Sequence, residues 1–89
     1  MMKQYHLTVS GRVQGVGFRY FTLFTARSLD IKGWVRNLEN GDVEIMATGK
    51  DEALDQFLGK IRVGPKYSKV NQVVIQTQTV EEYKTFSIE

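Results

Sequence analysis

The sequence predicts an α+β fold in which one antiparallel sheet carries two helices on a single face. Three observations lead to this prediction. Several short segments alternate apolar and polar residues with a period of two, as strands with one buried face do. Two longer segments repeat their apolar residues every three or four positions, as amphipathic helices do. The chain has 89 residues, 42% of them hydrophobic, which suits one small domain spanning residues 1–89.

The first strand and the loop after it are predicted from alternation and glycine content. Tyr5, Leu7 and Val9 alternate with polar residues and indicate a strand that buries one face. Gly15 and Gly17 follow, and two glycines so near each other indicate a tight loop whose backbone closely approaches another group.

The first helix is predicted over residues 18–30, which contain neither glycine nor proline. Its stripe at helical spacing consists of Phe18, Phe21, Thr22, Thr25, Ala26 and Leu29. Tyr20, Leu23 and Phe24 lie outside this stripe. Periodicity leaves open whether these three pack at its edge or form exposed apolar surface.

A hairpin and a second helix follow. Residues 31–37 and 43–48 are predicted strands, and the Asn-Gly pair at 40–41 indicates a tight turn because such residues tolerate positive φ. Asp51 is predicted to cap the second helix, and the Gly-Pro pair at 64–65 to end it. The stripe of this helix consists of Leu54, Phe57, Leu58 and Ile61.

With a fourth strand at 73–75, the order of elements is βαββαβ, and residues 86–88 are expected to add a short terminal strand. Since each helix has one apolar stripe, both helices are expected on one face of a single sheet. A right-handed crossover leaves a gap between the first two strands, which the third strand fills. This is the ferredoxin-like split βαβ arrangement, and we expect all neighbouring strands to be antiparallel.

Composition excludes several classes of chemistry. The chain has no Cys, which excludes thiol nucleophiles, disulfides, zinc–thiolate sites and iron–sulfur clusters, and its one His excludes multi-histidine metal sites. A net charge of +2 suits a small anionic ligand and gives little reason to expect nucleic-acid or membrane binding. No apolar run suffices for a membrane span or a signal-peptide core, so we expect a cytoplasmic protein.

The segment from Gln14 to Arg19 connects the first strand to the first helix, where an anion site is expected. Backbone N–H groups in such a turn can point at one centre, and the first helical turn adds unpaired donors and partial positive charge. Arg19 adds a permanent charge and a planar fork suited to phosphate oxygens. The segment is neither a dinucleotide fingerprint nor a Walker loop. From the residues alone, a structural turn with an exposed arginine is an equally good interpretation.

Asn37 ends the second predicted strand, just before the hairpin turn. An Asn in that position is usually a turn former. If the first two strands run in the same direction, however, their carboxyl ends lie at one edge of the sheet. Asn37 would then lie near residues 14–19, where its amide could hold a water molecule facing the bound anion.

Other polar residues favour structural roles. His6 is expected to be solvated or packed, Trp34 to pack on the sheet, and Arg36 to form a salt bridge on the same side as Trp34. The carboxylates of Glu39, Asp42 and Glu44 near the hairpin are spaced as in a solvated turn, so no metal site is predicted.

Two motifs resemble the signatures of the acylphosphatase family. The first is Gly11-Arg12-Val13-Gln14-Gly15-Val16-Gly17-Phe18-Arg19, and the second is Gly33-Trp34-Val35-Arg36-Asn37 followed by Gly41, Val43 and Gly49. The resemblance extends from about Tyr5 to Ile88 and is looser around 66–68 and 76–84.

This resemblance implies an acylphosphatase, a hydrolase that cleaves the mixed anhydride between a carboxylate and a phosphate without metal or organic cofactor. By position, Arg19 would bind the phosphate and Asn37 would orient the attacking water. Backbone amides of the loop would complete the phosphate site, namely those of Gly15, Val16, Gly17, Phe18 and Arg19. The expected partners are a small acyl phosphate and inorganic phosphate, with no nucleic acid or membrane, and a monomeric enzyme is expected.

Two other functions remain open on this fold. It also hosts RNA-binding domains, although the central strands here lack the aromatic run that such domains use. The other is a non-catalytic module that binds an acyl or carbamoyl phosphate inside a larger maturation enzyme. The length of 89 residues favours a free-standing enzyme over that second function.

Overall fold

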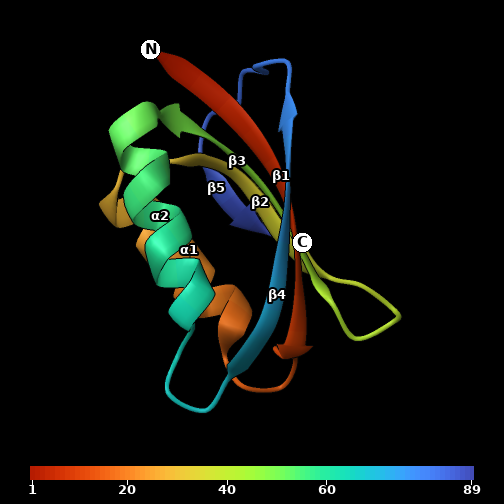
Figure 1. Cartoon of the computed structure of the whole chain (residues 1–89). Coiled ribbons are helices and arrows are strands. Elements are labelled where there is room, and N and C mark those ends of the chain that lie inside the picture. Colours follow the sequence, from red (N-terminus) through yellow and green to blue (C-terminus); the bar gives the residue numbers. More distant parts are fainter.

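The computed structural model describes residues 1–89 and contains the two predicted layers. In chain order the elements are β1 (Met2–Arg12), α1 (Phe18–Ser28), β2 (Lys32–Asn37), β3 (Val43–Lys50), α2 (Asp51–Val63), β4 (Lys69–Gln78) and β5 (Phe86–Ile88). Both helices cover one face of the sheet and leave the other face open (Figure 1). The strand order β4-β1-β3-β2-β5 confirms the ferredoxin-like arrangement. Neither helix has the length and apolar content that a membrane span requires.

β1 and β3 form the centre of the sheet. β1 pairs antiparallel with both β3 and β4, and β3 pairs antiparallel with β2. β1 and β2 therefore run in the same direction, with β3 in the gap that the crossover leaves. Because β1 and β2 run in the same direction, their carboxyl ends lie at the same end of the sheet. There the loop after β1 can contact the last residues of β2.

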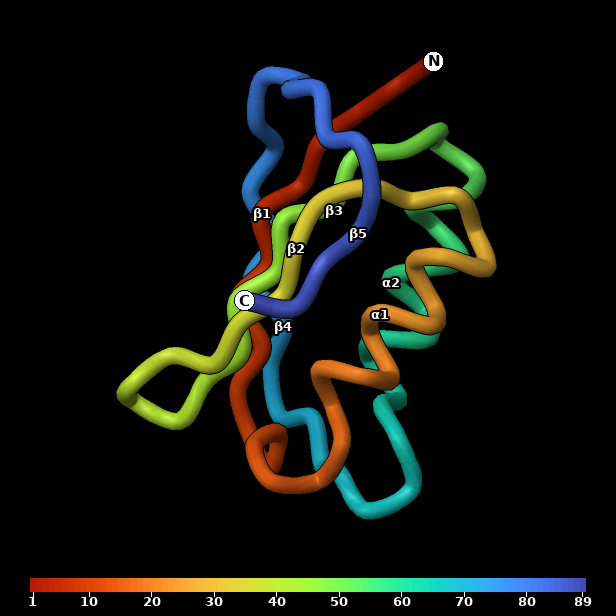
Figure 2. Tube along the Cα trace, turned by 180° about the vertical axis from the view of Figure 1, so that it is seen from behind, coloured from red at the N-terminus to blue at the C-terminus, as the bar shows by residue number.

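The prediction that all neighbouring strands are antiparallel is wrong at one edge of the sheet. β5 pairs with β2 in parallel, with Gly33 opposite Phe86. After β4 the chain reverses once through residues 79–85, so β5 takes the direction of β1 and β2. Figure 2 shows this connection passing from the β4 edge to the β2 edge. Since β5 joins the sheet beside β2 and not beside β4, the pairing is parallel.

A buried amide holds the connection between β4 and β5. Gln4 is fully buried, and its Oε1 accepts hydrogen bonds from Thr48 Oγ1 at 2.8 Å and from the backbone N–H of Glu81 at 2.7 Å. Its Nε2 donates to Glu81 Oε1 at 2.9 Å. An unsatisfied amide at this depth would cost about 1–3 kcal/mol. The network therefore fixes residues 79–85 against the end of the sheet.

The core lies between the sheet and the helices and uses the predicted stripes. The buried helical residues are Phe18, Thr22, Thr25 and Ala26 from α1 and Leu54, Phe57 and Ile61 from α2. Outside the stripe of α1, Leu23 packs against the core, whereas Tyr20 and Phe24 are exposed. The three residues whose role periodicity left open thus have two different roles.

The predicted cap of α2 is wrong. The helix begins at Asp51 itself, Lys50 occupies the N-cap position, and no side chain caps the helix. β3 runs directly into α2 without a loop, so the residue before the helix is the last residue of a strand. The Asp51 carboxylate instead lies 3.7 Å from Lys3 Nζ, near the positive end of the helix. The helix ends before Gly64, as predicted.

Candidate active site

The loop between β1 and α1 owes its shape to two glycines. Gly15 and Gly17 have φ values of 73° and 79°, and a Cβ at either position would meet no heavy atom within 4 Å. Backbone conformation, and not crowding within the chain, therefore favours glycine at both positions. Gly17 is the N-cap residue of α1, so the helix begins without a capping side chain.

The backbone N–H groups of residues 15–20 have no acceptor within the chain. The first helical bond of α1 runs from the N–H of Phe21 to the carbonyl of Gly17 at 3.0 Å, and no bond outside the helices and strands has its donor between 15 and 20. The first turn of α1 contains no acidic residue. Unpaired donors at the positive end of a helix favour an anion.

Arg19, the second residue of α1, carries an unpaired guanidinium. It is partly buried, whereas the other arginines are exposed. Arg19 makes no ion pair and no hydrogen bond within the chain, although Arg36 pairs with Glu44 and Arg27 donates to a backbone carbonyl. A partly buried charge normally has a partner. Because Arg19 has none within the chain, its guanidinium is available to an anionic ligand.

One small hollow brings the loop, Arg19 and Asn37 together. Its volume is about 190 Å³, and it is lined by Val13, Gly15, Gly17, Phe18, Arg19, Tyr20 and Asn37. The Oδ1 atom of Asn37 is buried and has no hydrogen-bond partner. Val16, which was predicted to contribute a backbone amide, is not among the lining residues, and its side chain packs against the core. No acidic side chain lines the hollow, and its chemistry therefore suits a small anion with a water molecule beside Asn37.

Gln14 connects the loop to the hairpin that follows Asn37. Its Nε2 donates to the backbone carbonyls of Leu38 at 2.7 Å and of Asp42 at 2.9 Å. Leu38 directly follows Asn37, so these bonds fix the distance between the two halves of the hollow. Sequence patterns do not single out Gln14 in this role, because they do not show which distant backbone groups a side chain reaches.

The weaker candidates form a separate cluster on the open face of the sheet. The Glu44 carboxylate accepts hydrogen bonds from His6 Nε2 at 2.7 Å and from Arg36 Nε. Partial burial alone would raise the pKa of Glu44, but these bonds and the positive charges behind them outweigh burial and lower the pKa below its ordinary value. The Arg36 guanidinium carbon lies 5.4 Å from the ring centre of Trp34. The predicted salt bridge of Arg36 is confirmed. The prediction that Glu44 belongs to a solvated turn is wrong, because Glu44 lies in β3 and its carboxylate is largely buried beneath His6 and Arg36.

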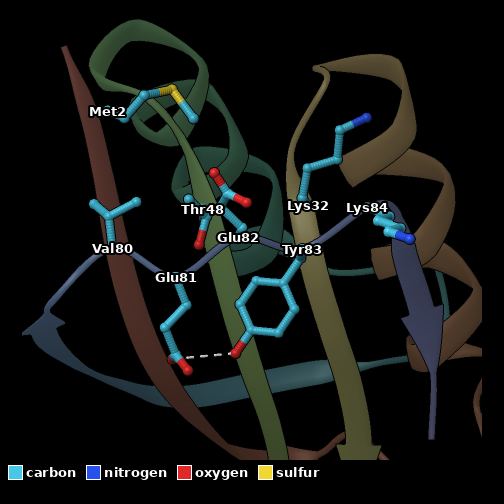
Figure 3. A pocket seen from close by; sticks show the side chains of 8 residues that line it. All are labelled: Met2, Lys32, Thr48, Val80, Glu81, Glu82, Tyr83 and Lys84. Carbon is cyan, nitrogen blue, oxygen red and sulfur yellow. Dashed lines mark hydrogen bonds between the residues drawn. The ribbon is translucent and has the colours of Figure 1, made fainter.

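A larger hollow of about 410 Å³ lies at the opposite end of the sheet. Its lining comprises Met2, Lys32, Thr48 and residues 80–84. Figure 3 shows the hydroxyl of Tyr83 hydrogen-bonded to Glu81 Oε1, at 3.2 Å. Burial, together with the neighbouring Glu81 carboxylate, raises the pKa of Tyr83. This hollow therefore combines a phenol that stays protonated at neutral pH with carboxylates and the ammonium groups of Lys32 and Lys84. Unlike the smaller hollow, it has acidic side chains in its lining, which disfavour an anion.

The fold and the smaller hollow define a class of protein: a ferredoxin-like domain whose strand-to-helix loop has free donors for an anion. The acylphosphatase family model matches residues 5–88. The acylphosphatase of Bacillus velezensis is 47% identical over 88 residues, which covers 98% of this chain and 98% of that protein. The crystal structure of acylphosphatase from Bacillus subtilis matches with a TM-score of 0.96 and 41% identity, over 100% of this chain and 99% of that one. The chain therefore belongs to the acylphosphatase family, whose members are hydrolases that act on acid anhydrides.

A much longer protein contains the same fold. Full-length HypF, crystallised in its phosphate- and nucleotide-bound form, matches with a TM-score of 0.90 and 27% identity, over 100% of this chain and 12% of that chain. The same architecture thus also occurs within a larger protein.

Proposed function

We propose that this chain hydrolyses the carboxyl–phosphate anhydride of small acyl phosphates, and that Arg19 and Asn37 are its catalytic residues. One observation carries the proposal: Gly15 and residues 17–20 with their unpaired N–H groups, the unpaired Arg19 guanidinium and the orphaned Asn37 oxygen lie around one hollow without acidic side chains. Family membership supports the same reaction.

In this proposal Arg19 and the loop amides bind the phosphoryl group. The guanidinium donates to two phosphate oxygens at once, which a planar fork does well. The amides of residues 15–19 offset the charge of the remaining oxygens. Donors that are fixed in advance at such a site are each worth about 100–1,000-fold in rate.

Asn37 positions the nucleophile. Its orphaned Oδ1 accepts a hydrogen bond from a water molecule and aims the water oxygen at phosphorus, in line with the bond to the acyl oxygen. Gln14 holds the hairpin beside the loop, which keeps Asn37 at the correct distance from the phosphate.

The reaction needs little further machinery. The water oxygen bonds to phosphorus while the bond from phosphorus to the acyl oxygen breaks, and that electron pair leaves with the carboxylate. The conjugate acid of such a carboxylate has a pKa of about 4, so no general acid is required. The hollow is lined by no carboxylate and no histidine, the usual general bases. The proton of the water therefore passes to a phosphate oxygen of the substrate.

The test compares benzoyl phosphate with p-nitrophenyl phosphate, side by side and with excess chelator present. We expect hydrolysis of benzoyl phosphate and no measurable hydrolysis of p-nitrophenyl phosphate, whose leaving group departs less readily. Equal rates on both substrates would contradict the proposal, and a loss of activity with chelator would reveal a required metal ion.

A second candidate is a module that binds acyl or carbamoyl phosphate without turning it over, and the match to part of HypF is the observation that favours it. Phosphate binding without hydrolysis of any acyl phosphate would support this candidate. The single domain over residues 1–89, the monomeric state and the cytoplasmic location stay predictions.

A further inference from the structure

The hollow beside Arg19 is small, and a phosphoryl group with its water molecule takes up much of it. Its volume is about 190 Å³, whereas pockets that enclose drug-sized molecules measure about 300–1,000 Å³. When the phosphoryl group and one water molecule occupy the hollow, a bulky acyl group therefore extends across its rim.

Tyr20 is the rim residue suited to an apolar acyl group. It lines the hollow, yet 61% of its surface is exposed. Of the other side chains that line the hollow, Val13 and Phe18 are buried in the core, and Arg19 and Asn37 are polar. Tyr20 is thus the one exposed apolar side chain at the place where the acyl group leaves the hollow.

Phe24 extends the apolar surface that begins at Tyr20. It lies one helical turn further along α1, is 64% exposed, and its ring centre lies 6.4 Å from that of Tyr20 with an angle of 33° between the rings. Residues four apart share one face of a helix. The two rings therefore form an exposed aromatic strip that starts at the hollow. Because both rings are exposed, packing of the core does not account for them.

We propose that Tyr20, supported by Phe24, binds the acyl group and makes the enzyme prefer acyl phosphates with an aromatic or large apolar acyl group. This inference rests on the proposed function of the hollow. A benzoyl ring packs against the phenol ring of Tyr20, whereas the methyl group of acetyl phosphate covers little of it. A paired aromatic contact of this kind changes affinity by about 3–10-fold.

The experiment measures kcat/KM for benzoyl phosphate and for acetyl phosphate in the wild type, Tyr20→Ala, Tyr20→Phe and Phe24→Ala. We expect Tyr20→Ala to lower kcat/KM for benzoyl phosphate about 3–10-fold, mainly through KM, with little change for acetyl phosphate. Tyr20→Phe keeps the ring and should keep the preference, and Phe24→Ala should show a smaller loss. Inhibition by inorganic phosphate should stay unchanged in all three variants, because the phosphate contacts remain.

Val80→Ala is the matched control, because it removes an exposed apolar side chain at the opposite end of the sheet. Its ratio of the two kcat/KM values should equal that of the wild type. An active wild type whose ratio does not change in Tyr20→Ala overturns this inference and leaves the proposed function intact. A wild type that hydrolyses neither substrate overturns the proposed function, and the inference with it.

Discussion

Two polar regions of this small domain are built in opposite ways. On the open face of the sheet, Glu44 binds His6 and Arg36, so the charged groups satisfy one another. At the loop between β1 and α1, Arg19 and the oxygen of Asn37 have no partner within the chain. An unsatisfied buried polar group costs about 1–3 kcal/mol. Unpaired groups that gather around one hollow are therefore a stronger sign of a binding site than charged groups that pair with one another.

The largest effect is expected from removing the unpaired guanidinium. Arg19→Ala should lower turnover of benzoyl phosphate at least 100-fold, because the phosphoryl group loses its charged donor. Inhibition by inorganic phosphate should weaken as well. Arg36→Ala is the control, since it removes a guanidinium that pairs with Glu44, and its turnover should match the wild type. Steady-state kinetics measure both variants, and near wild-type turnover by Arg19→Ala would refute the assignment.

Removing the orphaned carboxamide should have the next largest effect. Asn37→Ala should lower kcat by up to about 100-fold, because the water molecule loses its alignment. The inhibition constant of inorganic phosphate should change little, since Arg19 and the loop remain. Asn71→Ala, at an exposed position of β4, serves as the control. A selective loss of phosphate affinity in Asn37→Ala would mean that Asn37 binds phosphate and does not position water.

A smaller effect on turnover is expected from substitution of Gln14, whose hydrogen bonds connect the loop after β1 to the hairpin after β2. Gln14→Ala removes the donor to the carbonyls of Leu38 and Asp42 and should lower kcat about tenfold by displacing Asn37. Gln14→Glu has the same shape but no N–H donor, so it should lose as much. Kinetics and phosphate inhibition separate kcat from binding, and full kcat in Gln14→Glu would show that the two hydrogen bonds do not position Asn37.

The smallest effect on activity is expected from a substitution of Glu44, which binds His6 and Arg36 on the open face of the sheet. The same substitution should have a measurable effect on stability. Glu44→Gln should leave turnover unchanged and lower the free energy of unfolding by about 1 kcal/mol at pH 7. Because the pKa of Glu44 is lower in the folded chain than its ordinary value of 4.5, its contribution is present above pH 4.5 and is lost as the pH falls through the folded pKa. Urea unfolding at pH 7 and at lower pH measures the difference between variant and wild type. A difference that stays constant across this range would exclude the ion pair as its cause.

The parts of the structure that follow from local patterns were predictable from the sequence. The stripes of both helices identify the buried residues, and the glycines at 15 and 17 predict the loop between β1 and α1. The direction of β2 relative to β1 follows from the handedness of the crossover. These rules together predict that Asn37 lies near Arg19. The structure agrees, because both residues line the same hollow.

Features that depend on tertiary placement were not predictable in the same way. The parallel pairing of β5 depends on where residues 79–85 carry the chain, and the alternation of three residues does not encode direction. The two carbonyls bound by Gln14 lie in another segment. Tyr20 lies outside the buried stripe, and only the position of the hollow shows that it stands at a rim.

The central place of β1 has a consequence for the biosynthesis of this chain. Val9 pairs with Val43 on one side and with Val73 on the other, so β1 needs partners that are translated after it. Pairings that close long loops slow folding. In an emerging polypeptide β1 therefore lacks its second partner until residues 69–78 have been translated, and this nascent stage is when aggregation is expected.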